Sequence, residues 1–173
     1  KLIPLPTKDI TMLVPFNSPE KACESVSAVF IAGITPSSLE FIERDAIDWT
    51  MKYTDVSVNI SEETKAHLLI EVDGNDMDIL YSDCEKIAKV LEEFESGDML
   101  IADSNSEKEN LWRLRRSVAE SVKANSVYKE EDTVVPRAEL AKLLKGVKQI
   151  GDKYGFKSIC YGHAGDGNLH VNI

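Results

Sequence analysis

The chain has 173 residues, of which 43% are hydrophobic, and its 30 acidic and 20 basic residues give a formal net charge of −10. This length is sufficient for one ordinary hydrophobic core or a fused pair of small ones. The acidic balance argues against nucleic acid or an anionic membrane surface as a partner, since both attract patches of lysine and arginine. No apolar run approaches the roughly 20 residues that cross a bilayer, so we expect no transmembrane segment.

Strands and helices are predicted to alternate through the first hundred residues. Ser18 and Pro19 are typical of a helix start, as N-cap and first helical residue, and Gly33 is typical of its end. The predicted order is strand 9–16, helix 19–32, strand 37–42, a helix around 46–51, loop 54–64, strand 66–72, turn 73–75, a helix around 80–91 and strand 99–102.

The second half predicts a long helix over 106–124, a short strand 133–135, a helix from Pro136 to Gly155, and a closing hairpin. The complete order contains two β-α-β units, and no Gly-rich dinucleotide-binding loop accompanies them. We therefore predict an α+β fold in which an antiparallel sheet is flanked by helices, with two ferredoxin-like β-α-β units.

Two of the three histidines lie in the closing hairpin, around a glycine-rich turn. If the turn centres on Asp166 and Gly167, His163 and His170 are directly opposed, with Cβ atoms about 4.5–5.5 Å apart, close enough to share a metal ion. Asn172 lies two residues beyond His170 and points to the same face. The alternative to a metal site is that the two histidines simply pack within the hairpin. A phosphate-binding loop is disfavoured, because neither a lysine nor a helix start follows the glycines.

Arg115 is predicted to point inward from the 106–124 helix. At about 100° per residue, it lies about 40° from Leu111, within the apolar stripe. The stripe consists of Leu111, Leu114, Val118 and Val122. A buried arginine requires an anionic partner, because its guanidinium does not lose its proton. That partner is either an internal carboxylate, such as Glu71 or Glu40, or the carboxylate of a substrate; the sequence leaves both open.

Other distinctive residues have plainer interpretations. His67 lies in an apolar strand and is predicted to be a core histidine, and Trp49 and Trp112 are predicted to be core anchors. Lys129 and the acidic run 130–132 are expected in a solvated loop. Three cysteines without metal-type spacing indicate reduced, mostly buried thiols and a cytoplasmic location.

The residues that surround the histidines resemble the C-terminal (cap) domain of FAD-linked oxidases. The run 162–172 (Gly-His-Ala-Gly-Asp-Gly-Asn-Leu-His-Val-Asn) carries this resemblance, together with 111–115 and 132–136. Segments 39–42 and 69–74 also look like early strands of this family, so the resemblance covers essentially the whole chain. The family includes the glycolate oxidase D subunit, D-lactate dehydrogenases and D-2-hydroxyglutarate dehydrogenase.

The resemblance implies that residues 1–173 form a single cap domain over a separate FAD-binding domain. That domain is expected before residue 1, and a continuation with a glutamate as third metal ligand is expected after residue 173. We therefore expect residues 1–173 alone to be inactive and to bind metal weakly. A cytoplasmic protein is expected, held at a membrane at most through redox partners; the electron acceptor and homo-oligomerisation are left open.

The resemblance also assigns roles to residues. His163 and His170 would ligate a divalent metal, zinc or manganese, through which His170 is expected to be catalytic. Arg115 would hold the carboxylate of a small 2-hydroxy acid, Asn172 would contact this substrate, and Lys129 lies near a substrate-contacting lysine of some members. The C2 hydrogen would leave as hydride to the flavin of FAD, and a base would take the hydroxyl proton.

Ala119 stands where some hydroxyglutarate-type members have a threonine, which argues against that substrate. Two other functions stay open. One is a non-catalytic, ferredoxin-like module that binds a small molecule or mediates assembly. The other is a metallohydrolase that uses His163, His170 and Asp166, although Asp166 between two glycines is better suited to shaping a turn.

Overall fold

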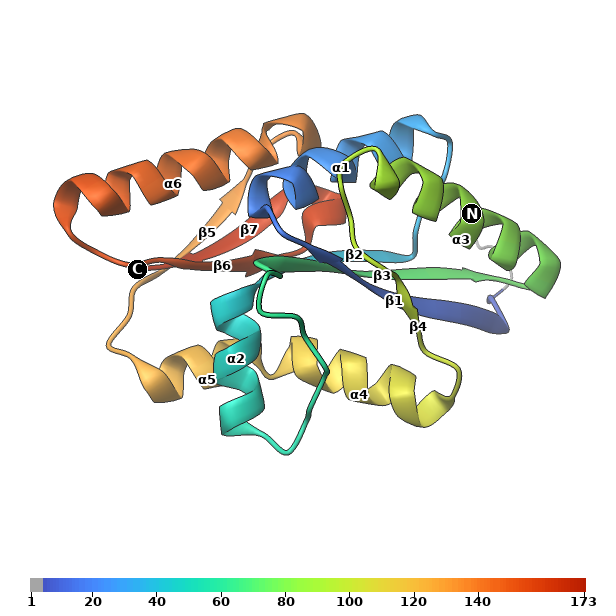
Figure 1. Ribbon diagram of the computed structural model, residues 1–173, viewed down its shortest axis with the longest axis horizontal. Coiled ribbons are helices and arrows are strands. Elements are labelled where there is room, and N and C mark those ends of the chain that lie inside the picture. The colour runs from blue at the N-terminus through green and yellow to red at the C-terminus, as the bar shows by residue number, and fades with distance from the viewer. Residues whose placement is uncertain (1–4) are drawn as a thin grey trace.

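A seven-stranded antiparallel sheet separates two layers of helices in the computed structural model, which describes residues 5–173 (Figure 1). The strands are β1 (Lys8–Phe16), β2 (Ser38–Glu43), β3 (Ala66–Gly74), β4 (Leu100–Ile101), β5 (Glu130–Val134), β6 (Ile159–Gly162) and β7 (Asn168–Asn172). The α-helices are α1 (Pro19–Ile31), α2 (Arg44–Tyr53), α3 (Met77–Glu92), α4 (Asn105–Arg116), α5 (Val118–Asn125) and α6 (Leu140–Tyr154), and two 3-10 turns are η1 (Arg137–Glu139) and η2 (Ala164–Asp166).

The strand order is β4-β1-β3-β2-β6-β7-β5. The units β1-α1-β2 and β3-α3-β4 interleave in the first four positions, which is the ferredoxin-like arrangement. Helices α1, α3 and α6 cover one face of the sheet, and α2, α4 and α5 cover the other (Figure 1). The predicted α+β class, with its antiparallel sheet and two β-α-β units, is confirmed, while residues 1–4 of the predicted domain lie outside the described part.

Period-2 alternation along the strands creates two apolar faces. Alternate residues such as Met12, Leu68 and Phe41 form the larger core, beneath α1, α3 and α6. Their neighbours on the other face form two smaller clusters: one with α2, α5 and Leu114, and the other with Leu111 of α4. Full burial of each such side chain contributes roughly 1.5–3 kcal/mol.

The long helix predicted over 106–124 is wrong in its continuity, since it divides at Ser117 into α4 and α5. Ser117 has φ −86° and ψ −4°, and its N–H is shared between the carbonyls of Arg113 and Arg115. The apolar contacts change before this break, between Leu111 and Leu114 of α4. Leu111 packs on Leu13 and Leu69, whereas the rest of the apolar stripe packs on α2 and β6.

The region of the acidic run also differs from the prediction. Residues 130–132 were expected in a loop and the strand only at 133–135, whereas β5 spans Glu130–Val134. This strand lies at the edge of the sheet and pairs only with β7, so charged side chains there keep contact with solvent. The following helix begins later than predicted: η1 comes after Pro136, and α6 starts at Leu140.

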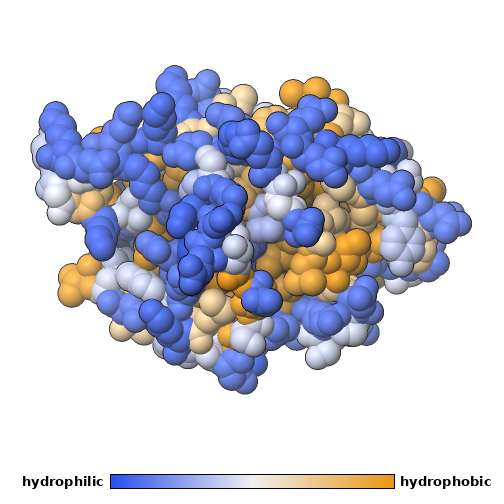
Figure 2. Space-filling model, in the orientation of Figure 1, coloured by the Kyte–Doolittle hydropathy of each residue, from blue (hydrophilic) through white to orange (hydrophobic). Residues whose placement is uncertain are grey.

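The opposite edge of the sheet carries an apolar surface patch. Figure 2 shows it to the right of centre, in the region where β4 lies in Figure 1. Leu100 and Ile101 of this two-residue strand are 50% and 36% exposed.

Within residues 5–173, no helix has both the length and the apolar character that crossing a bilayer requires.

The three cysteines are buried and unpaired with one another, as predicted. Burial, and secondarily the Glu43 carboxylate, raises the pKa of the Cys160 thiol to about 12. Glu43 is itself buried, accepts hydrogen bonds from the Cys160 backbone N–H (2.6 Å) and from Lys148 (2.8 Å), and so ties α6 to the sheet.

His67 of β3 is a core histidine, as predicted, with 3% exposure. Burial, and to a smaller extent the nearby Arg44 guanidinium, lowers the pKa of His67 to about 4. Its Nδ1 has no hydrogen-bond partner among the described residues. The native state therefore holds the neutral imidazole, and protonation favours unfolding.

The lowered pKa of His67 predicts that the free energy of unfolding decreases with acidification over a defined pH range. The stabilising contribution is complete above pH 6.5 and is lost as the pH falls toward 4, by about 2 kcal/mol between pH 7 and pH 4.5. Urea unfolding of the wild type and of His67→Leu at several pH values measures this contribution. The variant should show a weaker pH dependence over that window; a parallel loss in both proteins would contradict the prediction.

Candidate functional site

Polar side chains gather on the sheet face that α2, α4 and α5 cover. They come from β2, β5, β7, the end of α4 and the loop after β6, and comprise Glu40, Arg115, Glu130, Asp132, His163, His170 and Asn172. The register pairs His170 with Asp132, and Asn172 with Glu130. Directly paired residues point to the same face, so β5 and β7 together present two acids, a histidine and an amide.

The two histidines are not directly opposed, which corrects the predicted register. Tyr161 is the cross-strand partner of His170, and His163 lies beyond the ladder. The register differs because the turn that contains η2 uses more residues than the tight two-residue turn that was predicted. The Asp166 and Asn168 backbone N–H groups both donate to the His163 carbonyl (2.9 and 3.1 Å), and Gly167 closes the turn with φ +77°.

The imidazoles of His163 and His170 nevertheless lie close together, with ring centroids 5.8 Å apart and an interplanar angle of 76°. With Zn–N bonds of about 2.1 Å, the centroids of two rings that share one ion are roughly 5 to 6.4 Å apart. The observed spacing fits a shared ion. Among residues 5–173, however, no three His, Cys, Asp or Glu side chains are grouped so that they hold a metal, so the pair supplies an incomplete ligand set.

Carboxylates stand behind both imidazoles. His163 Nδ1 lies 2.9 Å from Glu40 Oε1. His170 Nδ1 lies 3.2 Å from Glu130 and 3.5 Å from Asp132, but is buried without hydrogen-bond geometry to any described residue. Carboxylates in this position fix the orientation of an imidazole and raise its basicity as a ligand.

Arg115 points inward as predicted, with its side chain only 10% exposed. The sequence left its partner open, and the structure shows that an internal partner is Glu40: Nε donates to Oε2 at 2.8 Å, and Nη2 lies 2.7 Å from the same oxygen. The guanidinium carbon also lies 5.3 Å from the centre of the Tyr161 ring, within reach of cation–π attraction.

Asn172 is 5% exposed on the same face as His170, as predicted. Its side-chain nitrogen is buried near the Tyr161 phenol but has no well-formed hydrogen bond with any described residue. An unsatisfied buried donor costs about 1–3 kcal/mol, so it marks a position where a ligand is favoured. Burial, followed by the Glu130 charge, raises the pKa of neighbouring Tyr161, which keeps its phenol protonated at neutral pH.

Lys129 is not brought together with the other predicted site residues. Its backbone pairs with Ile173 in both directions, directly before β5, so alternation directs its side chain away from the face of Glu130. The side chain is 79% exposed and forms an ion pair with Glu131 at 2.7 Å.

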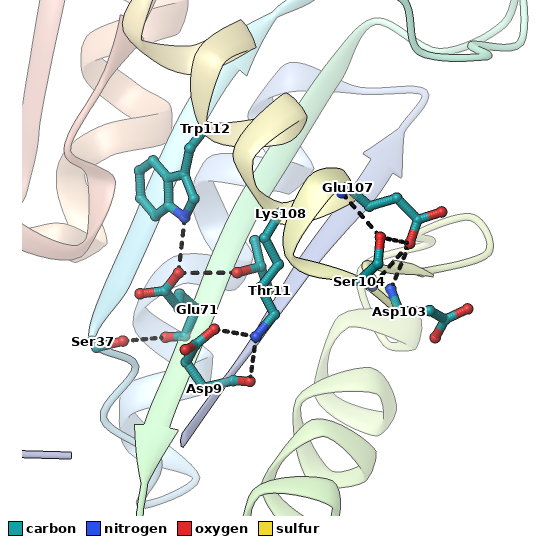
Figure 3. A network of polar contacts seen from close by, with 9 residues as sticks. All are labelled: Asp9, Thr11, Ser37, Glu71, Asp103, Ser104, Glu107, Lys108 and Trp112. Carbon is teal, nitrogen blue, oxygen red and sulfur yellow. Dashed lines mark hydrogen bonds and ion pairs between the residues drawn. The ribbon is translucent and has the colours of Figure 1, made fainter. Parts of the chain in front are cut away.

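Trp112 anchors α4 over the sheet, one turn before Arg115. Its indole N–H donates to Glu71 Oε2 at 2.8 Å, and the Thr11 hydroxyl donates to the same oxygen at 2.9 Å (Figure 3). The capping box of Ser104 and Glu107 satisfies the start of the helix (Figure 3). Both ends of α4 are thereby fixed, which fixes the direction of the arginine.

Sequence reasoning missed Tyr161, Glu130 and Asp132 as members of the site, and considered Glu40 only as a partner of Arg115. Glu40 had a signal, because it is a carboxylate within an otherwise apolar strand segment. Glu130 and Asp132 had one too, because a spacing of two places both on one face of a strand.

A cavity of about 260 Å³ opens beside this cluster. Its walls include Ser37, Ser38, Glu40, Arg137, His163 and Asp166. Its volume is slightly below the 300–1,000 Å³ that is typical of ligand pockets, so it suits a molecule of few atoms.

Comparison with protein families identifies one model, described as the C-terminal domain of FAD linked oxidases, which matches residues 5–173. A D-lactate dehydrogenase of Anaerostipes hadrus is 32% identical over 99% of this chain, and the glycolate oxidase subunit GlcD of Bacillus subtilis is 32% identical over 98%. GlcD of Escherichia coli K12 is 29% identical over the whole chain. The chain spans only 37%, 36% and 34% of these relatives.

Solved structures share the fold. p-Cresol methylhydroxylase with substrate bound superposes with a TM-score of 0.64 at 13% identity, covering 98% of this chain and 39% of that protein. Alkyldihydroxyacetonephosphate synthase gives 0.60 at 13% identity, covering 96% and 36%. At these identities the likeness concerns the fold alone.

Two glycines, Gly167 in the turn between the histidines and Gly146 in α6, predict substitutions of opposite sign. A Cβ at Gly167 would meet the Val135 carbonyl and would require φ +77°, so Gly167→Ala should destabilise the protein by about 2 kcal/mol or more. Gly146 lies within α6, and a Cβ there meets nothing within 4 Å, so Gly146→Ala should stabilise by about 0.5–1 kcal/mol. Urea unfolding measures both; a Gly167→Ala variant as stable as the wild type would contradict the described turn, and Gly146→Ala is the control for the substitution itself.

Proposed function

Because the chain belongs to the C-terminal domain family of FAD-linked oxidases, we propose that it is the substrate-binding cap of an FAD-dependent oxidoreductase. The reaction is the oxidation of a D-2-hydroxy acid or glycolate to the 2-keto acid, since relatives are named D-lactate dehydrogenase and glycolate oxidase subunit. The observation that carries the proposal is the convergence of the paired imidazoles, Arg115 and Asn172 on one face of the sheet.

Each residue has a distinct part. Arg115 binds the substrate carboxylate, and Nη1 is the nitrogen for this contact, because Glu40 occupies the edge formed by Nε and Nη2. Asn172 donates its unsatisfied side-chain N–H to the substrate. His163 and His170 would hold a divalent ion, zinc or manganese, that polarises the hydroxyl of the substrate.

The donor set fits such an ion in kind and spacing, although it is incomplete among the described residues. The remaining ligands come from substrate, water or residues outside 5–173. A bound ion would lower the pKa of the 2-hydroxyl, whose proton would pass to a base, and the flavin would accept the C2 hydrogen as hydride. Orientation of the acid between Arg115 and the histidines is the contribution of this chain.

In this proposal, Lys129 lies outside the substrate-binding cluster. Its exposed ammonium, paired with Glu131, contributes to attraction of the substrate anion and not to its orientation. The cytoplasmic location and the oligomeric state stay predictions.

A non-catalytic binding module is the second candidate. The observation in its favour is that residues 5–173 contain no group of three metal-binding side chains. A metallohydrolase based on Asp166 is less compatible with the structure, since this residue is exposed within η2 and its backbone N–H donates to His163 in the turn.

Anaerobic reduction of the flavin tests the proposed function. The purified full-length protein should show a visible flavin band that bleaches with one acid from a panel of D- and L-2-hydroxy acids. Prior chelation and His170→Ala should each slow bleaching by 100-fold or more, because both remove the polarising ion. Stopped-flow absorbance gives the rates.

Lys142→Ala is the matched control, because this lysine is 84% exposed and pairs with Glu139 at the start of α6, on the sheet face opposite the site (Figure 1). Its bleaching rate should equal that of the wild type. A protein that has a flavin band but responds to none of the acids would contradict the proposed substrate class, and a protein without the band would favour the binding module.

A further inference from the structure

Glu40 is a buried carboxylate with more partners than any other group of the site. It lies in β2 with 5% exposure. A carboxylate removed from water is costly unless opposite charge and hydrogen bonds compensate it. Three hydrogen bonds do so, from Arg115 Nε at 2.8 Å, the Ser38 hydroxyl at 3.0 Å and His163 Nδ1 at 2.9 Å. The guanidinium also forms an ion pair with Glu40, with Nη2 2.7 Å from Oε2.

The two oxygens of Glu40 divide these partners. Oε2 contacts the guanidinium of Arg115, whereas Oε1 contacts His163 and Ser38. Strand β2 thereby connects helix α4 with the loop after β6 through a single side chain. The two connected groups are those assigned to the substrate carboxylate and to the metal.

The contact with Oε1 specifies the tautomer of His163. A carboxylate oxygen accepts hydrogen bonds, so Nδ1 carries the hydrogen in the neutral ring. The lone pair then resides on Nε2, and a metal requires such a lone pair.

His170 repeats this arrangement in a looser form. Its Nδ1 faces Glu130 and Asp132 at 3.2 and 3.5 Å. In both imidazoles, therefore, Nδ1 is directed toward carboxylates, and Nε2 is the nitrogen that remains for a shared ion.

We infer that Glu40 is a positioning residue that couples the two halves of the site. It orients Arg115 through one oxygen and, through the other, holds His163 in the Nδ1–H tautomer with Nε2 available to metal. The inference rests on the proposed function for the identity of the metal and substrate. The tautomer, in contrast, is a property of the metal-free protein.

Glu40→Gln tests the inference, with Glu71→Gln as the matched control. Glu71 is a carboxylate on the same sheet face that also accepts two side-chain hydrogen bonds, from Trp112 and Thr11 (Figure 3). The side-chain hydrogen bond and ion pair of His163 are with Glu40, not with Glu71. Both variants keep the side-chain size and one acceptor oxygen. Imidazole ¹⁵N shifts of the full-length, metal-free protein at pH 8 report the tautomer, and equilibrium dialysis reports zinc affinity.

The wild type and Glu71→Gln should both show His163 as the Nδ1–H tautomer. Glu40→Gln should show a mixture of tautomers and bind zinc about 10–100-fold more weakly, as expected for loss of a carboxylate behind a metal-bound histidine. A wild-type His163 in the Nε2–H form would overturn the inference, even if Glu40→Gln does not fold. Equal losses of zinc affinity in the two variants would overturn it as well.

A different result would separate the inference from the proposed function. If the wild type binds no zinc but its Nδ1–H tautomer is lost only in Glu40→Gln, the positioning role of Glu40 stands and the proposed metal chemistry fails. If zinc binds and the tautomer is unchanged by Glu40→Gln, the proposed function stands and the positioning role fails.

Discussion

The site depends on one buried ion pair, between Glu40 and Arg115. Both side chains are at most 10% exposed, so neither charge is hydrated when the other is absent. Removal of one partner of such a pair typically costs 3–5 kcal/mol, because the remaining charge stays buried and uncompensated. Strand β2, the end of α4 and the loop after β6 consequently share one electrostatic constraint. The site is therefore part of the packing between the sheet and its helices, in contrast to a site composed only of surface loops.

The division of the helical layer explains how an arginine comes to be buried there. Helix α4 packs with Leu111 on one apolar cluster, and Leu114 and α5 pack on another. Arg115 lies in the last turn of α4, directly after Leu114, the first residue of the apolar stripe that belongs to the second cluster. Polar groups of the sheet occupy this region, and Trp112 fixes the helix above them through Glu71. The change of apolar cluster within α4 thus places Arg115 beside the polar groups of the sheet.

Much of this architecture could be predicted from local chemistry. Ser18 and Pro19 marked the start of α1, and the 100° periodicity placed Arg115 on the inner face of its helix. The predictions failed where tertiary contacts determine the local structure. These places are the helix break at Ser117, the length of β5, and the position of His163 relative to the strand register. Periodicity does not reveal how many residues a turn uses, and η2 uses enough of them to remove His163 from the ladder. The short distance between the imidazoles followed from the hairpin despite this shift.

The balance of charge around the imidazoles indicates the kind of ligand that the cluster favours. Glu40, Glu130 and Asp132 contribute three negative charges, and Arg115 contributes one positive charge, so the neighbourhood of the two rings carries a net charge of −2. An anion alone is repelled by this field, apart from its contact with Arg115. Under the proposed function, a divalent cation would neutralise this charge and stand beside the guanidinium as a second positive group. A 2-hydroxy carboxylate offers oxygens to both groups, so in this proposal the cation and the acid would favour each other's binding.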